Sequence, residues 1–351
     1  MTKRYAFTVV LTTALFCLLA TAGALAGPTF KIAWSHYTGW EPWQLANHQK
    51  ILKKWADKLG IGIELVLVND YVESINLYTG GGFQGCAMTN MDALTIPAAG
   101  GVDSTALIVG DFSNGNDGIV MKNGSQVKDL KGREIKLVQL SVSHYLLARA
   151  LEMNGMTERD VRLVNTSDAD IAALFAEDPN GAVVTWNPPL MQCRNVKGAE
   201  LVFDSSRIPG EIIDLMVVRT DSPASLKKAL VGAWYETMKL MSGKSKVADE
   251  AIRYMAKFAG GTEAEFRAQL TTTKMFFDPR EAADFAKSDQ LKKTMEYVRT
   301  FSFGHGLYPK GADSKDYVGI RFPDGSVMGS SQNVKLRFDA ETMQQAAEGK
   351  L

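Results

Sequence analysis

Short apolar runs alternate with stretches of helical periodicity through this 351-residue chain, and few architectures accommodate that alternation. Phe30 to Trp34 is a strand-like run, and Trp43 to Leu59 repeats apolar residues at helical spacing. Ile63 to Val68 alternates like a strand, and Asp70 is placed to cap a helix that stops at Gly80. Further strand candidates are 85–88, 106–109, 118–121, 134–138, 161–164, 182–185, 200–203 and 215–218. The pattern predicts an α/β protein with largely parallel sheets and helices on both faces.

One supersecondary unit is loosely repeated. Glu64 to Asn90 carries a strand, an acid-capped helix, a glycine-bearing turn and a second strand, and Val161 to Asn187 carries the same order. Two ordinary βαβ units would share this order, which is the alternative. The repeat predicts two lobes of like construction, near residues 28–118 and 119–217. Because ligands bind beyond the carboxyl ends of such strands, facing lobes would place those ends around one cleft.

The first 26 residues have the pattern of an export signal. Lys3 and Arg4 precede an apolar run from Ala6 to Ala20, and Ala24-Leu25-Ala26 is a small-residue cleavage pattern. The run is short for a membrane span. We expect cleavage after Ala26, with an uncleaved membrane anchor as the alternative. At roughly 150 residues per domain, the remaining length suggests about two domains.

Cysteine and histidine usage argues against a metal centre. Two of the three cysteines, Cys86 and Cys193, lie beyond the export segment. We expect both to be free and buried, with a disulfide between them as the alternative. Neither C-x-x-C nor H-E-x-x-H spacing occurs among the cysteines and the four histidines, His36, His48, His144 and His305. We therefore expect no metal and no cofactor.

Side chains suited to ligand contact follow several predicted strands. The loop from Trp34 to Trp43 holds four aromatic residues and a histidine, with a plug that closes the core as the alternative. Asp111 to Asp117 is polar and turn-rich, and a solvated loop is its alternative. Ser141 and Ser143 open a helix, where their hydroxyls either cap it or meet a ligand. The candidate ligand-binding residues are Trp34, Tyr37, Trp40, Thr89, Asp92, Asp111, Asp117, Ser143, His144, Trp186, Glu211 and Asp214.

The distribution of charge bears on the class of ligand. The chain has 39 basic and 39 acidic residues, so nothing favours a nucleic-acid partner. Yet the 63 residues from Leu59 to Met121 contain no Lys or Arg, where the average of 39 in 351 would place seven. Seven acids remain in this stretch, among them Asp92, Asp111 and Asp117. It spans most strand ends of the first predicted lobe and therefore indicates a local negative bias around the cleft.

An ordered set of segments resembles the solute-binding proteins of nitrate, sulfonate and taurine ABC transporters. The likeness covers roughly residues 29–220 and rests on 34–42, 88–92, 113–117, 129–132, 143–145, 185–188 and 213–214. More narrowly, residues 31–43, 90–97 and 204–215 are similar to the subgroup found beside urea carboxylase and guanidine carboxylase genes.

The resemblance implies a type II periplasmic-binding-protein fold, in which two α/β lobes joined by two crossovers close on a ligand. Residues 1–26 would be the signal peptide, 27–118 with 219–351 a discontinuous first lobe, and 119–218 the second lobe. Residues 222–351 are expected to be mostly helical, because segments such as 226–241 and 248–258 are amphipathic. The resemblance implies a periplasmic monomer that hands a small molecule to an ABC permease of the inner membrane.

The expected ligand is small and rich in nitrogen. Trp186, Asp117 and Asp214 stand at positions that, in taurine-type members, resemble the aromatic and amine-facing acidic contacts. Carboxylates and aromatic faces suit guanidinium, a planar cation with donors on every edge and no acceptor. Urea is second, because carboxylates buried around a neutral ligand would cost several kcal/mol. A taurine-like zwitterion is third, since the helix start at Ser143 offers an anion site.

An enzyme on the same fold is the rival class. Ser143 or Cys86 would be the nucleophile, with His144 or His36 as base. The sequence contains no G-x-S-x-G, no P-loop and no G-x-G-x-x-G after a strand. Adjacent residues at a helix start also point in different directions, so Ser143 and His144 do not form a pair by themselves. We therefore expect a binding protein and not an enzyme.

Overall fold

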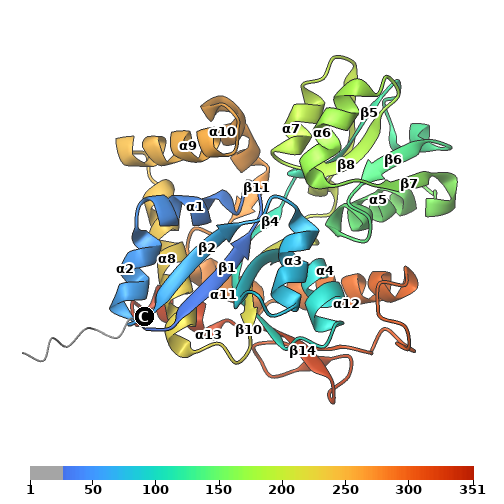
Figure 1. Cartoon of the computed structure of the whole chain (residues 1–351). Coiled ribbons are helices and arrows are strands. Elements are labelled where there is room, and N and C mark those ends of the chain that lie inside the picture. The colour runs from blue at the N-terminus through green and yellow to red at the C-terminus, as the bar shows by residue number, and fades with distance from the viewer. Residues whose placement is uncertain (1–26) are drawn as a thin grey trace, which may run out of the picture.

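The computed structural model describes residues 27–351, whose two β-sheets form two lobes, the smaller one drawn in green in Figure 1. The predicted export segment, residues 1–26, lies outside the described residues. The larger sheet has nine strands in the order β13-β12-β14-β4-β10-β3-β1-β2, with β11 paired to β4, and the smaller has five in the order β7-β6-β8-β5-β9. The strands are β1 Thr29–Trp34, β2 Gly62–Leu67, β3 Gly85–Thr89, β4 Ser104–Ser113, β5 Asp117–Lys122, β6 Glu134–Leu137, β7 Arg162–Asn165, β8 Ala182–Trp186, β9 Ala199–Asp204, β10 Ile213–Arg219, β11 Thr273–Met275, β12 Gly319–Arg321, β13 Val327–Met328 and β14 Val334–Phe338.

Helices pack on both sheets. In the larger lobe α3 packs against β1 and β3, whereas α8 and α11 pack against β4. No helix among residues 27–351 is long and apolar enough to cross a membrane. The helices are α1 Glu41–His48, α2 Ile51–Lys58, α3 Tyr71–Thr79, α4 Asn90–Ala93, α5 Val142–Met153, α6 Asp168–Glu177, α7 Pro189–Arg194, α8 Ala224–Met241, α9 Lys246–Phe258, α10 Glu263–Thr271, α11 Pro279–Ala286, α12 Asp289–Gly304 and α13 Glu341–Ala347.

The α/β class and the predicted strands are confirmed, and the loose repeat corresponds to one topology used twice. The orders β2-β1-β3-β10-β4 and β7-β6-β8-β5-β9 are equivalent, with an antiparallel strand in fourth place in each. The other four strands of each order run in one direction, so the sheets are largely parallel as predicted, apart from this one strand. β5 and β10 are the strands that the chain enters after crossing between lobes, so each starts at the cleft, where its neighbours β8 and β3 end.

Two local predictions need correction. The single helix predicted from Trp43 to Leu59 is two helices, α1 and α2, because Lys50 adopts a left-handed backbone with φ of 58°. The expectation that residues 222–351 are mostly helical holds for α8 to α13, but this segment also adds four short strands, β11 to β14, to the larger sheet. Such brief strands carry too few residues for a period-2 pattern to stand out.

The core supports the expected state of the cysteines. Cys86 on β3 and Cys193 on α7 are both free and fully buried, in different lobes. Burial raises the pKa of each thiol to about 12, so both remain neutral thiols at physiological pH. They therefore act as small apolar side chains of the core.

Candidate ligand-binding site

Strand ends and helix starts of both lobes meet around one small cavity, which we call the cleft cavity. The larger lobe contributes the loop after β1, the start of α3 and the ends of the β3 and β10 strands at the cleft. The smaller lobe contributes the starts of β5 and α5 and the end of β8. The cavity volume is about 10 Å³, close to what a single water molecule needs. Its lining residues are Tyr37, Trp40, Tyr71, Thr89, Asp117, Val142, Trp186, Ile212 and Asp214.

Aromatic rings form much of the wall. The ring centroids of Trp40 and Tyr71 lie 5.6 Å apart, and those of Tyr71 and Trp186 lie 5.3 Å apart in an edge-on arrangement. Tyr37 packs on Trp40 with a centroid separation of 5.0 Å. All four side chains are buried. Rings at several orientations offer π-faces to a compact cation.

Four buried aspartates, which we call the acid cluster, stand at or behind this wall. Asp117 and Asp214 line the cavity, while Asp111 and Asp92 lie behind it. The Tyr37 hydroxyl donates to Asp111 Oδ1 at 3.1 Å. One carboxyl oxygen of each of the four has no hydrogen-bond partner among residues 27–351. Buried polar atoms left unpaired are costly, so the cluster is suited to a ligand that donates hydrogen bonds.

Burial and mutual repulsion shift the titration of these carboxyls. Burial raises the pKa of Asp111 and of Asp117 to about 7. Burial and then the negative charges of Asp111 and Asp117 hold the pKa of Asp214 well above its ordinary range. The cause is geometric, because Asp214 and Asp111 are direct cross-strand neighbours on β10 and β4. Like charges so placed cannot all ionise without a compensating cation.

Asp92 has a different environment. Tyr71 and Thr89 donate hydroxyl hydrogen bonds to its Oδ2 at 2.6 and 2.9 Å. Burial raises the pKa of Asp92 to about 6, and hydrogen bonds from Tyr71, Thr89 and the backbone of Val142 oppose that rise. Val142 is the first residue of α5, so the positive end of this helix faces a carboxyl of the protein itself. The anion site predicted at this helix start is thus supplied with an internal anion.

The cleft cavity has no basic side chain to balance its acids. Among the residues that line the cleft cavity, none is Lys, Arg or His. Across the described part of the chain, no group of three or more His, Cys, Asp or Glu side chains converges as metal ligands do. The arrangement therefore offers acceptors and ring faces to an organic donor rather than a coordination shell to a metal ion.

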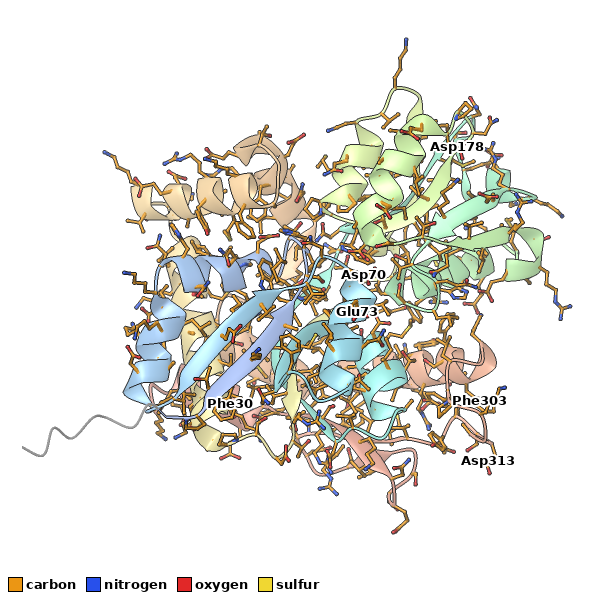
Figure 2. The ribbon with its side chains drawn as sticks, viewed as in Figure 1. Phe30, Asp70, Glu73, Asp178, Phe303 and Asp313 are labelled. Atoms are coloured by element: carbon orange, nitrogen blue, oxygen red, sulfur yellow. The ribbon has the colours of Figure 1, made fainter. Side chains whose placement is uncertain are left out.

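Contacts between the lobes close the cavity. The Ser167 hydroxyl donates to Asp70 Oδ2 at 2.9 Å, and the Tyr71 amide donates to Asp168 Oδ1 at 3.2 Å. Asp70 and Tyr71 stand at the start of α3, and Ser167 and Asp168 stand at the start of α6, the two helices of the repeated unit. Figure 2 labels Asp70, which lies where the two lobes meet. Trp186 Nε1 donates to the His36 carbonyl at 3.2 Å. The two lobes are therefore in direct contact around the cavity.

The structure brings most of the predicted site residues together but places three elsewhere. Trp34 stacks on Phe258 of α9, away from the cavity, with ring centroids 6.1 Å apart. His144 pairs with Glu158, and the Glu211 carboxylate is held by Arg149 Nε at 2.9 Å. In each case a partner distant in sequence takes the side chain out of the cleft. Six predicted residues line the cavity, namely Tyr37, Trp40, Thr89, Asp117, Trp186 and Asp214.

The remaining predictions concern the start of α5. Ser141 is the N-cap and accepts from the Ser143 amide at 3.2 Å, so its hydroxyl serves the helix. Ser143 Oγ is buried without a partner among residues 27–351, next to the lining residue Val142. Sequence reasoning missed Tyr71, Val142 and Ile212 as lining residues. Tyr71 could have been predicted from the sequence, because this tyrosine directly follows the helix cap Asp70, at the carboxyl end of a predicted strand.

Comparison with known proteins agrees with this architecture. The chain is similar to the alkanesulfonate-binding protein SsuA from Xanthomonas axonopodis pv. citri bound to MOPS, with a TM-score of 0.64 and 17% identity over 80% of this chain and 94% of that one. The periplasmic aliphatic sulphonate binding protein SsuA from Escherichia coli gives a TM-score of 0.65 and 18% identity over 82% and 95% of the two chains. The periplasmic nitrate-binding protein NrtA from Synechocystis PCC 6803 gives 0.58 and 13% over 92% and 98%.

These TM-scores establish a shared two-lobed periplasmic-binding-protein fold. A comparison with curated proteins finds no match. The sequence model of one family, described as NMT1/THI5 like, matches residues 53–231, which is just over half of the chain. The matched segment runs from α2 into α8 and includes both crossovers between the lobes. This chain belongs to the NMT1/THI5-like family.

Proposed function

We propose that the chain is the periplasmic substrate-binding component of an ABC importer and that it captures a small organic cation, guanidinium foremost. The lobes that move would be residues 27–118 with 219–351 and residues 119–218. Support for the class comes from the family, the fold and the sulfonate- and nitrate-binding proteins that share it. An importer component implies a membrane permease as partner.

One observation carries the choice of a cation. The acid cluster holds four buried carboxyls, each with an oxygen unpaired among the described residues, around a cavity whose lining has no basic side chain. Guanidinium has donors on every edge and is weakly hydrated for a cation, so carboxylates pair with its edges while a ring covers its face. Asp117 and Asp214 belong to different lobes, so a ligand that bridges them favours closure.

Urea is the second candidate, and a specific atom favours it. Trp40 Nε1 is a buried donor with no partner among residues 27–351, and a ligand with one acceptor oxygen would satisfy it. The raised pKa values of the acid cluster allow protonated carboxyls to surround a neutral ligand. A taurine-like zwitterion is less favoured than in the sequence-based expectation, because Asp92 already occupies the α5 helix start where its anionic group would bind.

The rival enzyme has little support. His144 is directed to Glu158 and to the Leu140 amide, and His36 pairs with Glu41, so neither predicted base is hydrogen-bonded to Ser143. Burial raises the pKa of Cys86 to about 12, and a neutral buried thiol is a poor nucleophile. Binding without turnover is therefore the function that we propose.

A thermal-shift series tests the ligand. Guanidinium chloride, methylguanidine, urea, taurine and nitrate would be compared at low millimolar concentration against sodium chloride of equal ionic strength. A ligand at 100 times its dissociation constant adds about 2.7 kcal/mol to stability, so guanidinium should raise the melting temperature measurably. Stabilisation by urea at every pH would favour the second candidate. Stabilisation by taurine or nitrate alone would overturn the proposal of a cationic ligand.

A further inference from the structure

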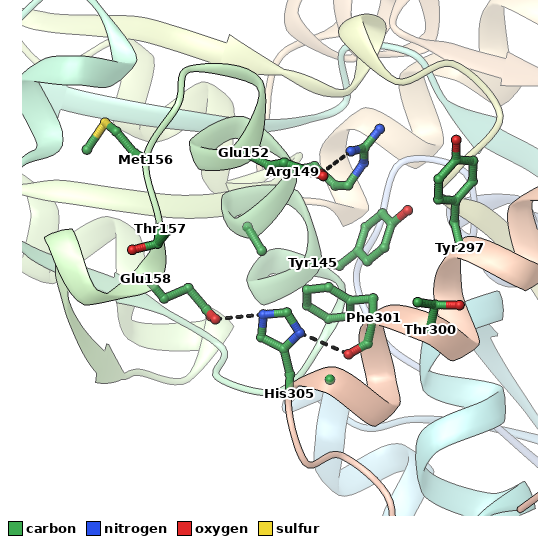
Figure 3. Close-up of a pocket in the computed structure, with 12 residues that line it drawn as sticks. Tyr145, Arg149, Glu152, Met156, Thr157, Glu158, Tyr297, Thr300, Phe301 and His305 are labelled. Atoms are coloured by element: carbon green, nitrogen blue, oxygen red, sulfur yellow. Dashed lines mark hydrogen bonds and ion pairs between the residues drawn. The ribbon is translucent and has the colours of Figure 1, made fainter. Parts of the chain in front are cut away.

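A second contact between the lobes lies away from the cleft cavity, at the pocket in Figure 3. Helix α5 of the smaller lobe faces helix α12 of the larger lobe across it. Glu158, in the short helical turn Glu158–Asp160 of the smaller lobe, pairs with two histidines. One is His144 on α5, and the other is His305, which caps the carboxyl end of α12 at a distance of 2.6 Å from Nε2 to Glu158 Oε2.

The hydrogen bonds determine which histidine carries a charge. His305 Nδ1 lies 2.9 Å from the Phe301 carbonyl, while its Nε2 faces the Glu158 carboxylate. Both partners are acceptors, so both ring nitrogens of His305 must carry hydrogen, which makes the ring an imidazolium. His144 differs, because its Nδ1 accepts from the Leu140 amide at 3.2 Å. A neutral His144 therefore suffices to donate to Glu158 through Nε2.

We propose that His305 and Glu158 form a proton-dependent latch that favours the closed arrangement of the lobes. The latch joins the lobes directly, since His305 belongs to the helix of one and Glu158 to the turn of the other. Phe301 stacks on the His305 ring at 3.9 Å between centroids and fixes its orientation. Opening the lobes separates the two groups and returns both to solvent.

Other charged groups around the pocket are engaged elsewhere. On α5, Arg149 binds Glu152 and Glu211, and its guanidinium lies 5.6 Å from the Tyr297 ring of α12. Tyr145 donates to Glu211 at 2.6 Å. The Glu158 hydrogen bond raises the pKa of His305 above its ordinary 6.5. Burial works against ionisation of Glu158, but the two histidines lower its pKa to about 2.

The latch should be stronger at low pH than at high pH. Closure raises the pKa of His305, so the latch contributes fully below the ordinary histidine pKa and is lost as pH rises through the raised value. The acid cluster also favours closure at low pH when no cation is bound, because its carboxyls are then protonated. Only a comparison of variants separates the two effects.

Distance measurements without ligand provide the test. Spin labels at Leu174→Cys on α6 and Val247→Cys on α9 report the separation of the lobes, because both sites are exposed while Cys86 and Cys193 are buried. From pH 5.5 to pH 8.5, the closed-to-open ratio should fall in the native background, and this fall should be about two- to five-fold larger than the fall in His305→Gln. That factor corresponds to the free energy typical of a partly exposed ion pair. The matched control is His48→Gln, an exposed histidine that stacks on Tyr254 within the larger lobe.

The outcomes are distinct. The latch predicts that Glu158→Gln reproduces His305→Gln, that the double variant adds nothing further, and that His48→Gln behaves as the native protein. Equal pH dependence in the native protein and His305→Gln would overturn it, as would additive effects in the double variant. His305→Asn serves as a second variant, with circular dichroism to confirm folding. Since no ligand is present, failure of guanidinium to bind leaves this result unaffected.

Discussion

Asp214 on β10 lies directly opposite Asp111 on β4, and both carboxyls are buried at the cleft end of the larger sheet. Two like charges in such register destabilise a strand pair unless a proton or a cation compensates them. The pair therefore links the stability of the free protein to the occupancy of the cleft.

Replacement of the cavity-lining acids should weaken ligand capture without harming the fold. Asp117→Asn and Asp214→Asn each remove an ionic acceptor, so guanidinium binding should weaken about 10- to 100-fold, as expected for a hydrogen bond to a charged group. Isothermal titration calorimetry measures this loss. Above pH 7, the free variants should melt at the same or a higher temperature, because each substitution relieves repulsion among the buried carboxyls.

Asp57→Asn is the matched control for these substitutions. Asp57 lies on the exposed face of α2, where it pairs with Lys53. Its replacement should leave both affinity and melting temperature nearly unchanged. Native affinity in both cavity variants would contradict the assignment of the site.

Loss of the Trp186 ring should weaken the binding of a cation more than the binding of a neutral ligand. Trp186→Ala removes a face contact worth about 1 to 2 kcal/mol, whereas Trp186→Phe keeps a face and loses the hydrogen bond to the His36 carbonyl. Affinities of the two variants for guanidinium and urea separate these contributions. Trp34→Phe is the control, because Trp34 is equally buried but stacks on Phe258 outside the cavity. An equal loss in Trp186→Phe and Trp186→Ala would argue against a ring-face contact.

The free protein should lose stability as pH rises from about 5 to 8. The pKa values of Asp92, Asp111 and Asp117 are raised to about 6, 7 and 7, so the folded state holds protons that the unfolded state has released. Their contribution is complete below the ordinary carboxyl pKa near 3.8 and is lost as pH passes 6 to 7. Calorimetric melting curves across this range measure the effect.

The same titration makes cation binding release protons. Guanidinium affinity should therefore rise from pH 6 to 8, and binding heats should differ between buffers of different ionisation enthalpy. Urea binding should show neither effect. A melting temperature that climbs from pH 5 to 8 in the free protein would contradict the predicted titration of the acid cluster.

Gly39 should be intolerant of even one methyl group. A Cβ at this position would lie 2.3 Å from Asp111 Oδ2 and 2.6 Å from Tyr37 Cε1, so the hydrogen bond between those side chains would be displaced. Gly39→Ala should cost about 1 to 3 kcal/mol of unfolding free energy and weaken ligand binding. Gly243→Ala is the control, since its Cβ would meet only Ser245 Oγ at 3.9 Å. Equal melting temperatures for the two variants would show that the loop accommodates the methyl group.

Local patterns predicted the elements well, because strand alternation and capping act over a few residues. Asp70 caps α3 by accepting from the Glu73 amide at 2.9 Å, as its position before an apolar helix implies. The break between α1 and α2 was not predictable, since apolar spacing continues through it. The orientation of the Trp34 side chain was not predictable either, because its ring stacks on Phe258, a residue 224 positions away in the sequence.

The sequence alone determined that most strand ends of the first lobe would lack basic side chains at the cleft, because no Lys or Arg occurs between Leu59 and Met121. It also determined which side chains stand at strand ends. Only the tertiary structure decided that Asp117, from β5, and Asp214, from β10, share one cavity, and that Glu211 is withdrawn by Arg149. The physical reason is that convergence depends on crossovers and lobe closure, whereas hydrophobic periodicity reports only which face of an element is buried.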